Sequence, residues 1–455
     1  MTHAAIIDIG KTNVKLALVD LATLTEVAVR TAPNRVLPGP PWPHFHTDGQ
    51  WAFLRGALTE LATSHGIDAI CVTTHGACAA LLDGNGALAA PVLDYEHAGP
   101  DTTRDAYDQI RPSFSETGSP KLPLGLNLGA QLFWQLREDP TLRDRIRHVL
   151  MWPQYWGHKL TGQIASDICS LGCHTDLWAP MTHGFSTLPA ALGLAEKMAP
   201  ARAPGDVLGT LLPDLQATLG IGPVAVLCGL HDSNASLLPH LLGRQAPFAV
   251  VSTGTWVVSM AVGGHPVTLD PSRDTLINVN AFGDAVPSAR FMGGREYDLV
   301  QSGKPAVAGV ADADQVLAKR VMLLPSVVPE SGPFQGMPHR WANDPMTDPQ
   351  REVALGYYLA LMTAESLAAI GADGPSIIEG PFASNPWFCT MLHAATGRSV
   401  LSSSMRTGTA VGAAMLFARP KATADDRGAM MPDPRLAAYA RVWRTLAGAR
   451  QPDAS

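Results

Sequence analysis

The sequence predicts an α/β protein made of two similar halves. Apolar strand-like runs alternate with helix-like segments along almost the whole chain, which is the pattern of an α/β fold. A strand, a turn rich in Gly and Thr, and a second strand occur near residue 10 and again near residue 254. Because this spacing is too long for a solenoid repeat, it favours two duplicated domains, residues 1–244 and 245–455, which face a cleft.

The composition argues against a nucleic-acid-binding protein and against a membrane-spanning protein. The chain has 455 residues, 33 Lys and Arg against 40 Asp and Glu, a formal net charge of −7 and 46% hydrophobic residues. Binding to nucleic acid needs a basic face, so we expect no nucleic-acid partner. No apolar run of the sequence is long enough for a membrane span, and we expect no secretory signal because no Lys/Arg region precedes an apolar stretch near residue 1. Six cysteines without metal-ligand spacing suit a reducing environment, so we expect a cytoplasmic protein.

The first half opens with the features of a strand–turn–strand unit. The elements expected there are, in order, a buried strand at His3–Asp8, a turn at Gly10–Asn13, a half-buried strand at Val14–Leu18, a helix at 53–65, a strand at Ala69–Thr73 and a hairpin joining Ala80–Leu82 to Leu88–Val92. A further strand at Val224–Cys228 and a helix at Ser233–Leu242 flank a turn at Gly229–Asp232.

The second half begins with the repeated unit. The elements expected there are strands at Phe248–Val251 and Trp256–Ala261, a helix at 353–370 with one apolar face, a strand at Ser376–Glu379, helices at Pro386–Thr396 and Gly408–Ala418, a loop at 420–434, a helix containing Leu436 and Trp443, and six disordered residues at the end.

The first turn could hold phosphates. Gly10 allows backbone N–H groups to approach an anion, Thr12 and Asn13 add side-chain donors, and Lys11 adds a charge. Asp8 ends the preceding strand, and an acid beside a phosphate implies an intervening cation, so we expect Mg²⁺ held there through water. The alternative is an ordinary hairpin turn.

The matching turn of the second half contains Thr253, Gly254 and Thr255, and two such turns could grip the β- and γ-phosphates of a nucleotide. Asp232 follows an apolar strand and could be the general base that accepts a proton from a hydroxyl attacking a phosphoryl group. The alternative for Asp232 is a helix N-cap.

Several polar residues could bind a sugar or a nucleoside. His75 and Gly76 follow a strand, where α/β folds place ligands, although His75 could be a core histidine. Asp94 and Glu96 could accept hydrogen bonds from paired hydroxyls, or could belong to a solvated turn. The loop at 379–385 could face a ribose or purine, or could be a plain helix cap.

Taken together, these motifs resemble the FGGY carbohydrate kinases, within the actin- and hexokinase-like ATPases, from residue 4 to about 419. Asp-Ile-Gly-Lys-Thr-Asn at 8–13 and Ser-Thr-Gly-Thr-Trp at 252–256 are similar to the two phosphate motifs. Gly-Leu-His-Asp-Ser at 229–233 is similar to the segment with the catalytic aspartate, Thr-His-Gly-Ala at 74–77 to the sugar segment, and Glu-Gly-Pro-Phe-Ala-Ser-Asn at 379–385 to the adenosine loop.

The resemblance implies two ribonuclease-H-like domains, with ATP and Mg²⁺ in the cleft, and domain closure that excludes water. It implies phosphorylation of a ketose or 6-deoxy-ketohexose, such as L-fuculose or L-rhamnulose. The roles it implies are catalysis by Asp232, metal binding by Asp8 and Asp232, cofactor binding by Gly10, Lys11, Thr12, Asn13, Thr253, Gly254, Thr255, Gly380, Pro381, Ser384 and Asn385, and substrate binding by His75, Gly76, Asp94, Glu96 and His231.

The sequence departs from the family in three places. Pro381 and Phe382 stand where glycines are frequent, the Asp-x-Arg sugar signature reads Asp94-Tyr95-Glu96-His97, and Thr73 replaces a glutamine. These changes leave the sugar open. The alternatives are a non-catalytic sugar or nucleotide sensor on the same fold and an actin-like or chaperone-type ATPase; the oligomeric state, a homodimer included, is also open.

Overall fold

The computed structural model describes residues 1–301, 303, 306–402, 408–418 and 433–448. They form two compact units. Unit 1 comprises Met1–Gly243 and Ile277–Ala285 together with residues 408–418, and unit 2 comprises Arg244–Leu276 and the described residues within 286–402 and 433–448. The two short segments that join unit 1 lie beyond the expected division at residue 245. The expected loop at 420–434 lies mostly outside the described residues. The last six residues, which were expected to be disordered, lie entirely outside them.

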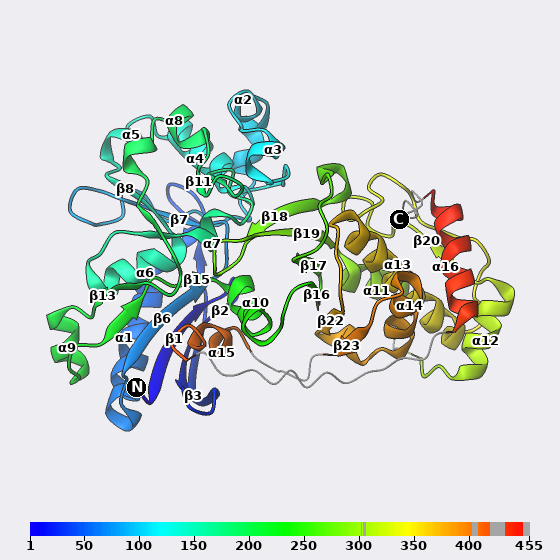
Figure 1. Cartoon of the computed structure of the whole chain (residues 1–455). Helices are drawn as coiled ribbons and strands as arrows, with labels where there is room; N and C mark the ends of the chain where they lie inside the picture. The colour runs from blue at the N-terminus through cyan, green and yellow to red at the C-terminus, as the bar shows by residue number, and fades with distance from the viewer. Residues whose placement is uncertain (302, 304–305, 403–407, 419–432, 449–455) are drawn as a thin grey trace. The chain divides into compact units, whose positions relative to one another are not determined.

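Unit 1 is organised around a seven-stranded sheet of order β13-β14-β6-β1-β2-β3, with β15 also paired to β6 (Figure 1). Its strands are β1 (His3–Ile9), β2 (Asn13–Asp20), β3 (Thr25–Pro33), β6 (Ala69–Thr74), β13 (Val207–Thr210), β14 (Ala225–Leu227) and β15 (Leu230–His231). The β1–β2 pair is antiparallel, whereas β1, β14 and β15 each run parallel to their β6 neighbour.

Helices cover both faces of this sheet. On one face, Ile7 and Leu16 pack with Leu58 of α1 (Thr47–His65). On the other face, Ile6 packs with Ala413 of α15 (Thr409–Ala414), which comes from the far end of the chain and lies beside β1 in Figure 1. As a result β2 is buried on both sides, and the predicted half-buried strand is wrong in this respect.

The rest of unit 1 is assembled from short elements. These are β4 (Val36–Leu37), β5 (His44–Phe45), β7 (Ala79–Leu82), η1 (Gly99–Thr103), α2 (Arg104–Asp108), α3 (Phe114–Thr117), α4 (Leu128–Glu138), α5 (Leu142–Arg145), β8 (His148–Met151), α6 (Trp152–Thr161), β9 (Ser166–Asp167), α7 (Ile168–Leu171), β10 (Trp178–Ala179), β11 (Gly184–Phe185), α8 (Leu188–Ala191), η2 (Ala195–Lys197), β12 (Ala201–Arg202), α9 (Pro213–Leu219) and α10 (Asp232–Gly243). The turn of the expected hairpin after β7 is present, because Leu82 forms an antiparallel bridge with Leu88, the Asp83 N–H donates to the Ala87 carbonyl and the Ala89 N–H donates to the Leu81 carbonyl. The expected second strand at Leu88–Val92 does not form, and β7 instead pairs with the distant β8.

Unit 2 contains most of a six-stranded sheet of order β18-β19-β17-β16-β22-β23, of which residues Ile277–Val279 and Ala285 belong to unit 1. Its strands are β16 (Phe248–Thr253), β17 (Val257–Val262), β18 (Thr275–Val279), β19 (Ala285–Phe291), β22 (Ser376–Glu379) and β23 (Val400–Ser402). The other elements are η3 (Pro271–Arg273), α11 (Gly293–Gln301), α12 (Val310–Lys319), β20 (Leu323–Leu324), β21 (Arg340–Trp341), α13 (Asp348–Ala369), η4 (Pro381–Ser384), α14 (Pro386–Thr396) and α16 (Pro434–Ala447).

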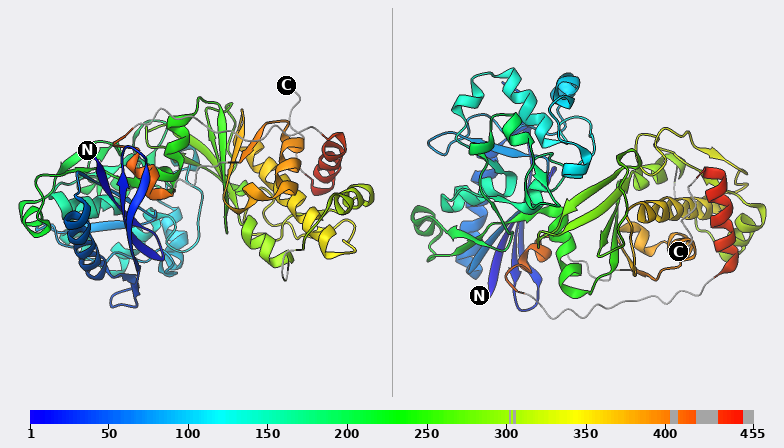
Figure 2. Two further views of the ribbon diagram at one scale, coloured as in Figure 1. Left: turned by 90° about the horizontal axis from the view of Figure 1, so that it is seen from below. Right: turned by 45° about the horizontal axis from the view of Figure 1, so that its top comes forward.

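The central helix of unit 2 is α13, the long gold helix in the right-hand view of Figure 2. Every residue from Val353 to Leu367 is buried, because α13 packs against β17 on the sheet and against α11, α12 and α14. The predicted helix is confirmed, and the residues of its predicted apolar face are buried. Burial also extends to the other faces of the helix, including the polar side chains of Thr363, Glu365 and Ser366.

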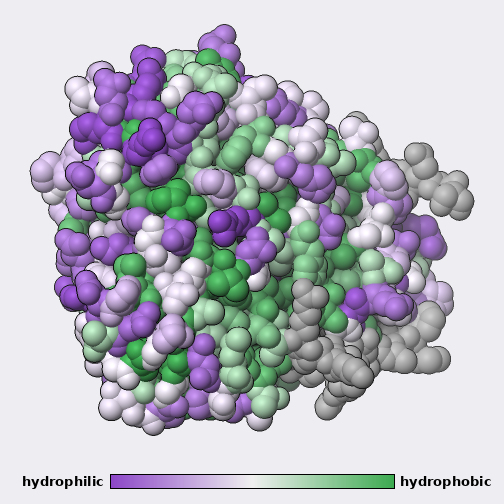
Figure 3. Space-filling view, turned by 60° about the vertical axis from the view of Figure 1, so that its left-hand side comes forward, coloured by the Kyte–Doolittle hydropathy of each residue, from purple (hydrophilic) through white to green (hydrophobic). Residues whose placement is uncertain are grey.

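The surface combines polar and apolar residues. The face in Figure 3 has hydrophilic side chains gathered in one corner and hydrophobic atoms interspersed elsewhere. Single exposed apolar side chains of this kind are normal for folded proteins. Within the described parts of the chain, no helix combines the length and the apolar character needed to cross a bilayer.

Candidate functional site

Three parallel strands of unit 1 bring distant motifs to one edge of its sheet. In register, Asp8 of β1 pairs with Thr73 of β6, which pairs in turn with Leu230 of β15. Parallel strands end at the same edge, which is where α/β folds bind ligands. The first turn, the segment after Thr74 and the segment at Asp232 therefore meet there.

Two hydrogen bonds from Asn34 support the first turn, at Gly10–Asn13. The Gly10 N–H donates to the Asn13 carbonyl at 2.9 Å and closes the turn. The Asn34 N–H donates to the Thr12 carbonyl and its side-chain amide donates to the Gly10 carbonyl, both at 2.8 Å. Thr12 and Asn13 are exposed, so their side-chain donors are available to a ligand. Asn34 belongs to no motif, and sequence reasoning missed it.

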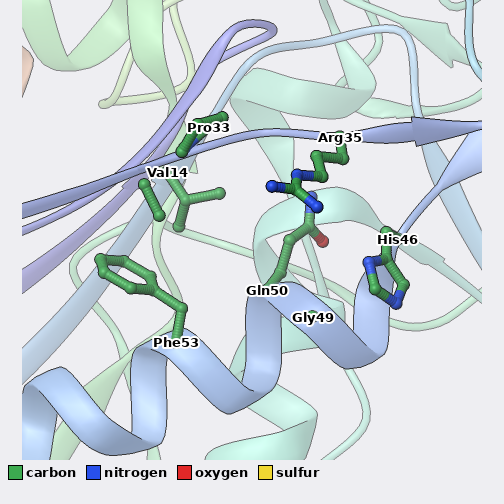
Figure 4. A pocket seen from close by; sticks show the side chains of 8 residues that line it. Val14, Pro33, Arg35, His46, Gly49, Gln50 and Phe53 are labelled. Carbon is green, nitrogen blue, oxygen red and sulfur yellow. The ribbon is translucent and has the colours of Figure 1, made fainter.

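A pocket of about 250 Å³ lies on the far side of this support, between α1, β2 and β3 (Figure 4). Gln50 lines it and donates to the Asn34 side-chain oxygen, which fixes the orientation of the Gln50 amide. The Gln50 oxygen is buried without a hydrogen-bond partner among the described residues. The pocket shares only this hydrogen-bonded support with the phosphate turn and contains none of the predicted site residues.

Asp8 is a half-buried acid that feels the charge of a second acid, Asp232. Burial raises the pKa of Asp8 to about 6, and the negative charge of Asp232 contributes to the rise. Two carboxylates that repel each other favour a cation between them, and oxygen ligands are what Mg²⁺ prefers. In the described ranges, no group of three or more His, Cys, Asp or Glu is arranged so that it could hold a metal ion by itself. The residues therefore fit a Mg²⁺ ion that takes most of its ligands from phosphates and water.

Asp232 is the first residue of α10 and its side chain is 32% exposed. His231 Nδ1 lies 3.1 Å from Asp232 Oδ1 and 2.7 Å from Ser233 Oγ. Burial alone would raise the pKa of Asp232, but the His231 charge lowers it below its ordinary value. Burial opposes protonation of His231, yet Cys173 and Asp232 raise its pKa well above the ordinary value. Asp232 is thus ionised and reachable, as a general base must be.

His75 has an unpaired acceptor atom. Its Nδ1 lies 2.9 Å from the Gly76 carbonyl, which can only accept, so Nδ1 carries the proton. Burial lowers the pKa of His75, so the imidazole is neutral. Its Nε2 has no partner in the described structure, which suits acceptance of a bond from a substrate hydroxyl. A Cβ at Gly76 would lie 2.3 Å from His231 Nε2, so only glycine fits there.

Lys11, predicted to hold phosphate, is engaged by two acids. Its ammonium forms an ion pair with Asp94 Oδ1 and lies 3.2 Å from Glu96 Oε2. It also lies 4.6 Å from the centre of the Tyr95 ring and 5.2 Å from that of Phe45. Lys11 therefore joins the residues predicted to bind sugar. The contact spans 83 positions in the sequence, and no local pattern indicates it.

In unit 2, the second turn and the adenosine loop meet in the same way. Register pairs Ser252 of β16 with Glu379 of the parallel strand β22. The Thr253 hydroxyl donates to the Glu379 carbonyl and accepts from the Phe382 N–H at 3.1 Å. Gly380 has φ +81°, and a Cβ there would lie 1.9 Å from the Thr253 carbonyl oxygen. The second turn and the 379–385 loop are therefore hydrogen-bonded to each other, and their close approach requires glycine at position 380.

A pocket of about 640 Å³ opens beside these segments. The predicted residues that line it are Gly254, Thr255, Pro381, Ser384 and Asn385. The Asn385 side chain also caps α14 by accepting from Trp387 N and Phe388 N, so the helix-cap interpretation holds for it. The cavity and the glycine cradle fit a nucleoside.

The other lining residues of this pocket include Tyr297, Glu352 and Trp387. The Tyr297 hydroxyl lies 3.1 and 3.0 Å from the two Glu352 oxygens, and Gln301 donates to Glu352 Oε2 at 2.6 Å. Burial raises the pKa of Glu352. Sequence reasoning missed Tyr297 and Glu352 because they lie on helices remote from any motif, and it missed Trp387 although Trp387 lies only two residues after the 379–385 loop.

Family models match almost the whole chain. Residues 3–239 match the N-terminal domain of the FGGY family of carbohydrate kinases, and residues 245–426 match the C-terminal domain described as carbohydrate kinase FGGY. The L-fuculokinase of Salmonella typhi is 26% identical over 268 residues, which are 57% of this chain and 56% of that protein. The xylulose kinase of Escherichia coli (strain K12) is 26% identical over 271 residues, 56% of this chain and 53% of that protein. The chain thus spans about half the length of the curated relatives it matches.

Solved structures of carbohydrate kinases resemble this chain over nearly its whole length. A carbohydrate kinase from Novosphingobium aromaticivorans has a TM-score of 0.91 at 34% identity, covering 97% of this chain and 100% of that one. A xylulose kinase from Rhodospirillum rubrum has a TM-score of 0.77 at 20% identity, covering 98% of each chain, which supports the fold alone. The predicted fold class, α/β with the two-domain actin- and hexokinase-like architecture, is confirmed. The chain belongs to the FGGY family of carbohydrate kinases.

Proposed function

We propose that this protein is an ATP-dependent kinase that phosphorylates a hydroxyl of a small sugar, a ketose or 6-deoxy-ketohexose such as L-fuculose or L-rhamnulose. The observation that carries the proposal is an ionised, reachable Asp232 at the strand edge that also holds Asp8 and His75. The names of the similar proteins, among them an L-fuculokinase and a rhamnulokinase, support the choice of sugar class.

The residues divide into five proposed roles. Asp232 is the general base, and Asp8 with Asp232 faces Mg²⁺. Phosphates are held by Gly10, Thr12, Asn13, Thr253, Gly254 and Thr255. The nucleoside is held by Gly380, Pro381, Ser384 and Asn385, and the sugar by His75, Gly76, Asp94, Glu96 and His231.

In the proposed mechanism, a sugar hydroxyl attacks the γ-phosphorus of ATP. Its oxygen forms the new bond to phosphorus, the bond to the β-phosphate oxygen breaks, and ADP leaves. Asp232 accepts the hydroxyl proton, and the His231 charge keeps the Asp232 carboxylate ionised until then. Bound Mg²⁺ would neutralise charge on the phosphates. His75 Nε2 accepts from a second hydroxyl and so orients the sugar.

The proposed chemistry is tested by ADP release over a panel of ketoses, aldoses and polyols, with and without magnesium. We expect Asp232→Asn to lower kcat about 10²- to 10⁴-fold. Asp144→Asn, at an exposed helical position, is the matched control. If Asp232→Asn retains most activity, Asp232 is not the base. Sugar binding without turnover indicates a sensor, and sugar-independent hydrolysis indicates an ATPase of another kind.

We also propose a cytoplasmic location and a small-molecule substrate as the partner. The six cysteines are all free and buried, which suits a reducing compartment. A homodimer is a further prediction, and light scattering of the purified protein tests it.

A further inference from the structure

We propose that Lys11 is a positioning residue for the sugar and not a ligand of the nucleotide phosphates. In this role Lys11 orients the carboxylate of Asp94 and balances the charge of Asp94 and Glu96. The inference rests on the proposed function for the identity of the ligand, and on the contacts of Lys11 for its role.

The ammonium of Lys11 has little capacity left for a phosphate. One of its three N–H donors is hydrogen-bonded to Asp94, and Glu96 Oε2 lies 3.2 Å from the same nitrogen as a second ion-pair partner. Two aromatic rings, of Tyr95 and Phe45, lie within 4.6 and 5.2 Å of the nitrogen and stabilise the cation where it is. To reach a phosphate, Lys11 would have to give up two ion pairs and both ring contacts.

The contact with Lys11 determines which oxygen of Asp94 is available. Oδ1 accepts from the Lys11 ammonium and from the Glu96 N–H at 3.2 Å. In the described structure no hydrogen bond uses Oδ2. The Asp94 side chain is 10% exposed, so this oxygen has little freedom to turn elsewhere. Lys11 thereby presents Oδ2 as the acceptor for a substrate hydroxyl.

Lys11 also shares its surroundings with the proposed sugar ligand His75. The Phe45 and Tyr95 rings that face Lys11 lie 5.1 and 5.4 Å from the His75 ring, measured between centroids. The aromatic wall therefore joins Lys11 to His75 and Asp94. This placement is independent of the ion pairs and puts Lys11 on the same side as the residues proposed to bind sugar.

The charge of the cluster sets the class of sugar. Asp94 and Glu96 contribute two negative charges and Lys11 one positive charge, so the group is net negative by one. A net negative group with an open carboxylate oxygen accepts bonds from neutral hydroxyls and repels anions. The cluster therefore favours a neutral ketose over an aldonate or a sugar phosphate.

The test uses the full-length protein with Lys11→Met, Lys11→Arg and the double variant Lys11→Met/Glu96→Gln. Steady-state kinetics give KM for sugar and for ATP, and calorimetry without sugar gives the affinity for ADP. Lys159→Met removes another lysine that faces an aromatic ring and is the matched control. Thermal melting of each variant identifies any loss of folding.

We expect Lys11→Met to raise the sugar KM about 10- to 100-fold, because a charge-assisted contact is lost. ADP affinity should stay within about two-fold. Lys11→Arg should keep the sugar KM near the wild-type value. The double variant Lys11→Met/Glu96→Gln should have a lower sugar KM than Lys11→Met alone, because the net charge of the cluster returns to minus one. Gluconate should remain a poorer substrate than neutral ketoses for wild type.

A loss of ADP affinity with an unchanged sugar KM would overturn the proposal, and so would equal losses of both or no change in either. If the wild type phosphorylates no sugar, the proposed function fails. The ADP affinity of Lys11→Met then still decides whether Lys11 holds phosphate, since that measurement needs no sugar.

Discussion

Burial and the negative charge of Asp232 together raise the pKa of Asp8 to about 6. In an unfolded chain the ordinary value is 3.8. Between these two values the folded state keeps a proton that the unfolded state releases, so stability falls as pH rises through this window. The penalty is absent below about pH 4 and complete above about pH 6, where it amounts to roughly 3 kcal/mol. Asp8 therefore costs stability at the pH at which it would bind a cation.

We expect Asp8→Asn to raise the free energy of unfolding of the ligand-free protein by about 1–3 kcal/mol at pH 8, and by less at pH 5. Magnesium with ADP should stabilise the wild type more than the variant. Urea unfolding at the two pH values measures the first effect, and thermal melting measures the second. Asp20→Asn is the control of opposite sign, because hydrogen bonds from Thr23 lower the pKa of Asp20. A pH-independent difference between Asp8→Asn and wild type would contradict the prediction.

The pH dependence of catalysis should depend on His231. Burial favours protonation of Asp232, and the adjacent His231 charge opposes this and lowers the pKa of Asp232. In His231→Asn that opposition is lost, so the acid limb of kcat/KM should move to higher pH. A pH profile of both proteins measures the shift. If kcat/KM falls equally at every pH, His231 acts by sugar contact alone.

A substitution at Gly76 tests the position of the His231 ring by steric displacement. A methyl group at Gly76 would lie 2.3 Å from His231 Nε2, so Gly76→Ala must displace that ring from its place beside Asp232. We expect kcat to fall about 10-fold or more, because small displacements of catalytic groups are costly. Gly84→Ala, where a methyl group meets no atom within 4 Å, is the control. Equal activity of the two variants would contradict the prediction.

The strand ends were predictable from the sequence, and the contacts between them were not. Asp8 and Asp232 follow apolar runs, and those runs became parallel strands that end at one edge. The residue types at such ends indicate chemistry without any knowledge of the fold. The direction of a long, flexible side chain depends on partners elsewhere in the chain, so the engagement of Lys11 by Asp94 could not be read from the turn.

Residues that support or line the sites were also beyond sequence reasoning. Asn34 supports the first turn from the end of an exposed strand, and Tyr297 and Glu352 reach the unit 2 pocket from separate helices. The pairing of β7 with β8 was missed for the same reason, since β8 lies far along the chain. Local patterns specify elements, whereas long-range packing selects neighbours.

The adenosine loop offers a test that separates backbone strain from a specific clash. Gly380 and Gly397 both have positive φ, at +81° and +68°, in unit 2. Alanine at either position incurs strain of roughly 1 kcal/mol. Only at Gly380 would the added Cβ also meet the Thr253 carbonyl oxygen, at 1.9 Å, whereas nothing lies within 4 Å of it at Gly397.

Gly380→Ala should therefore lower the free energy of unfolding by roughly 2–4 kcal/mol, and Gly397→Ala by about 1 kcal/mol. Only Gly380→Ala should weaken ADP binding, by about 10-fold, because the clash separates the adenosine loop from the second turn. Urea unfolding and calorimetry measure the two effects. Equal loss of ADP affinity in both variants would mean that strain in unit 2, and not the contact between Gly380 and Thr253, controls the pocket.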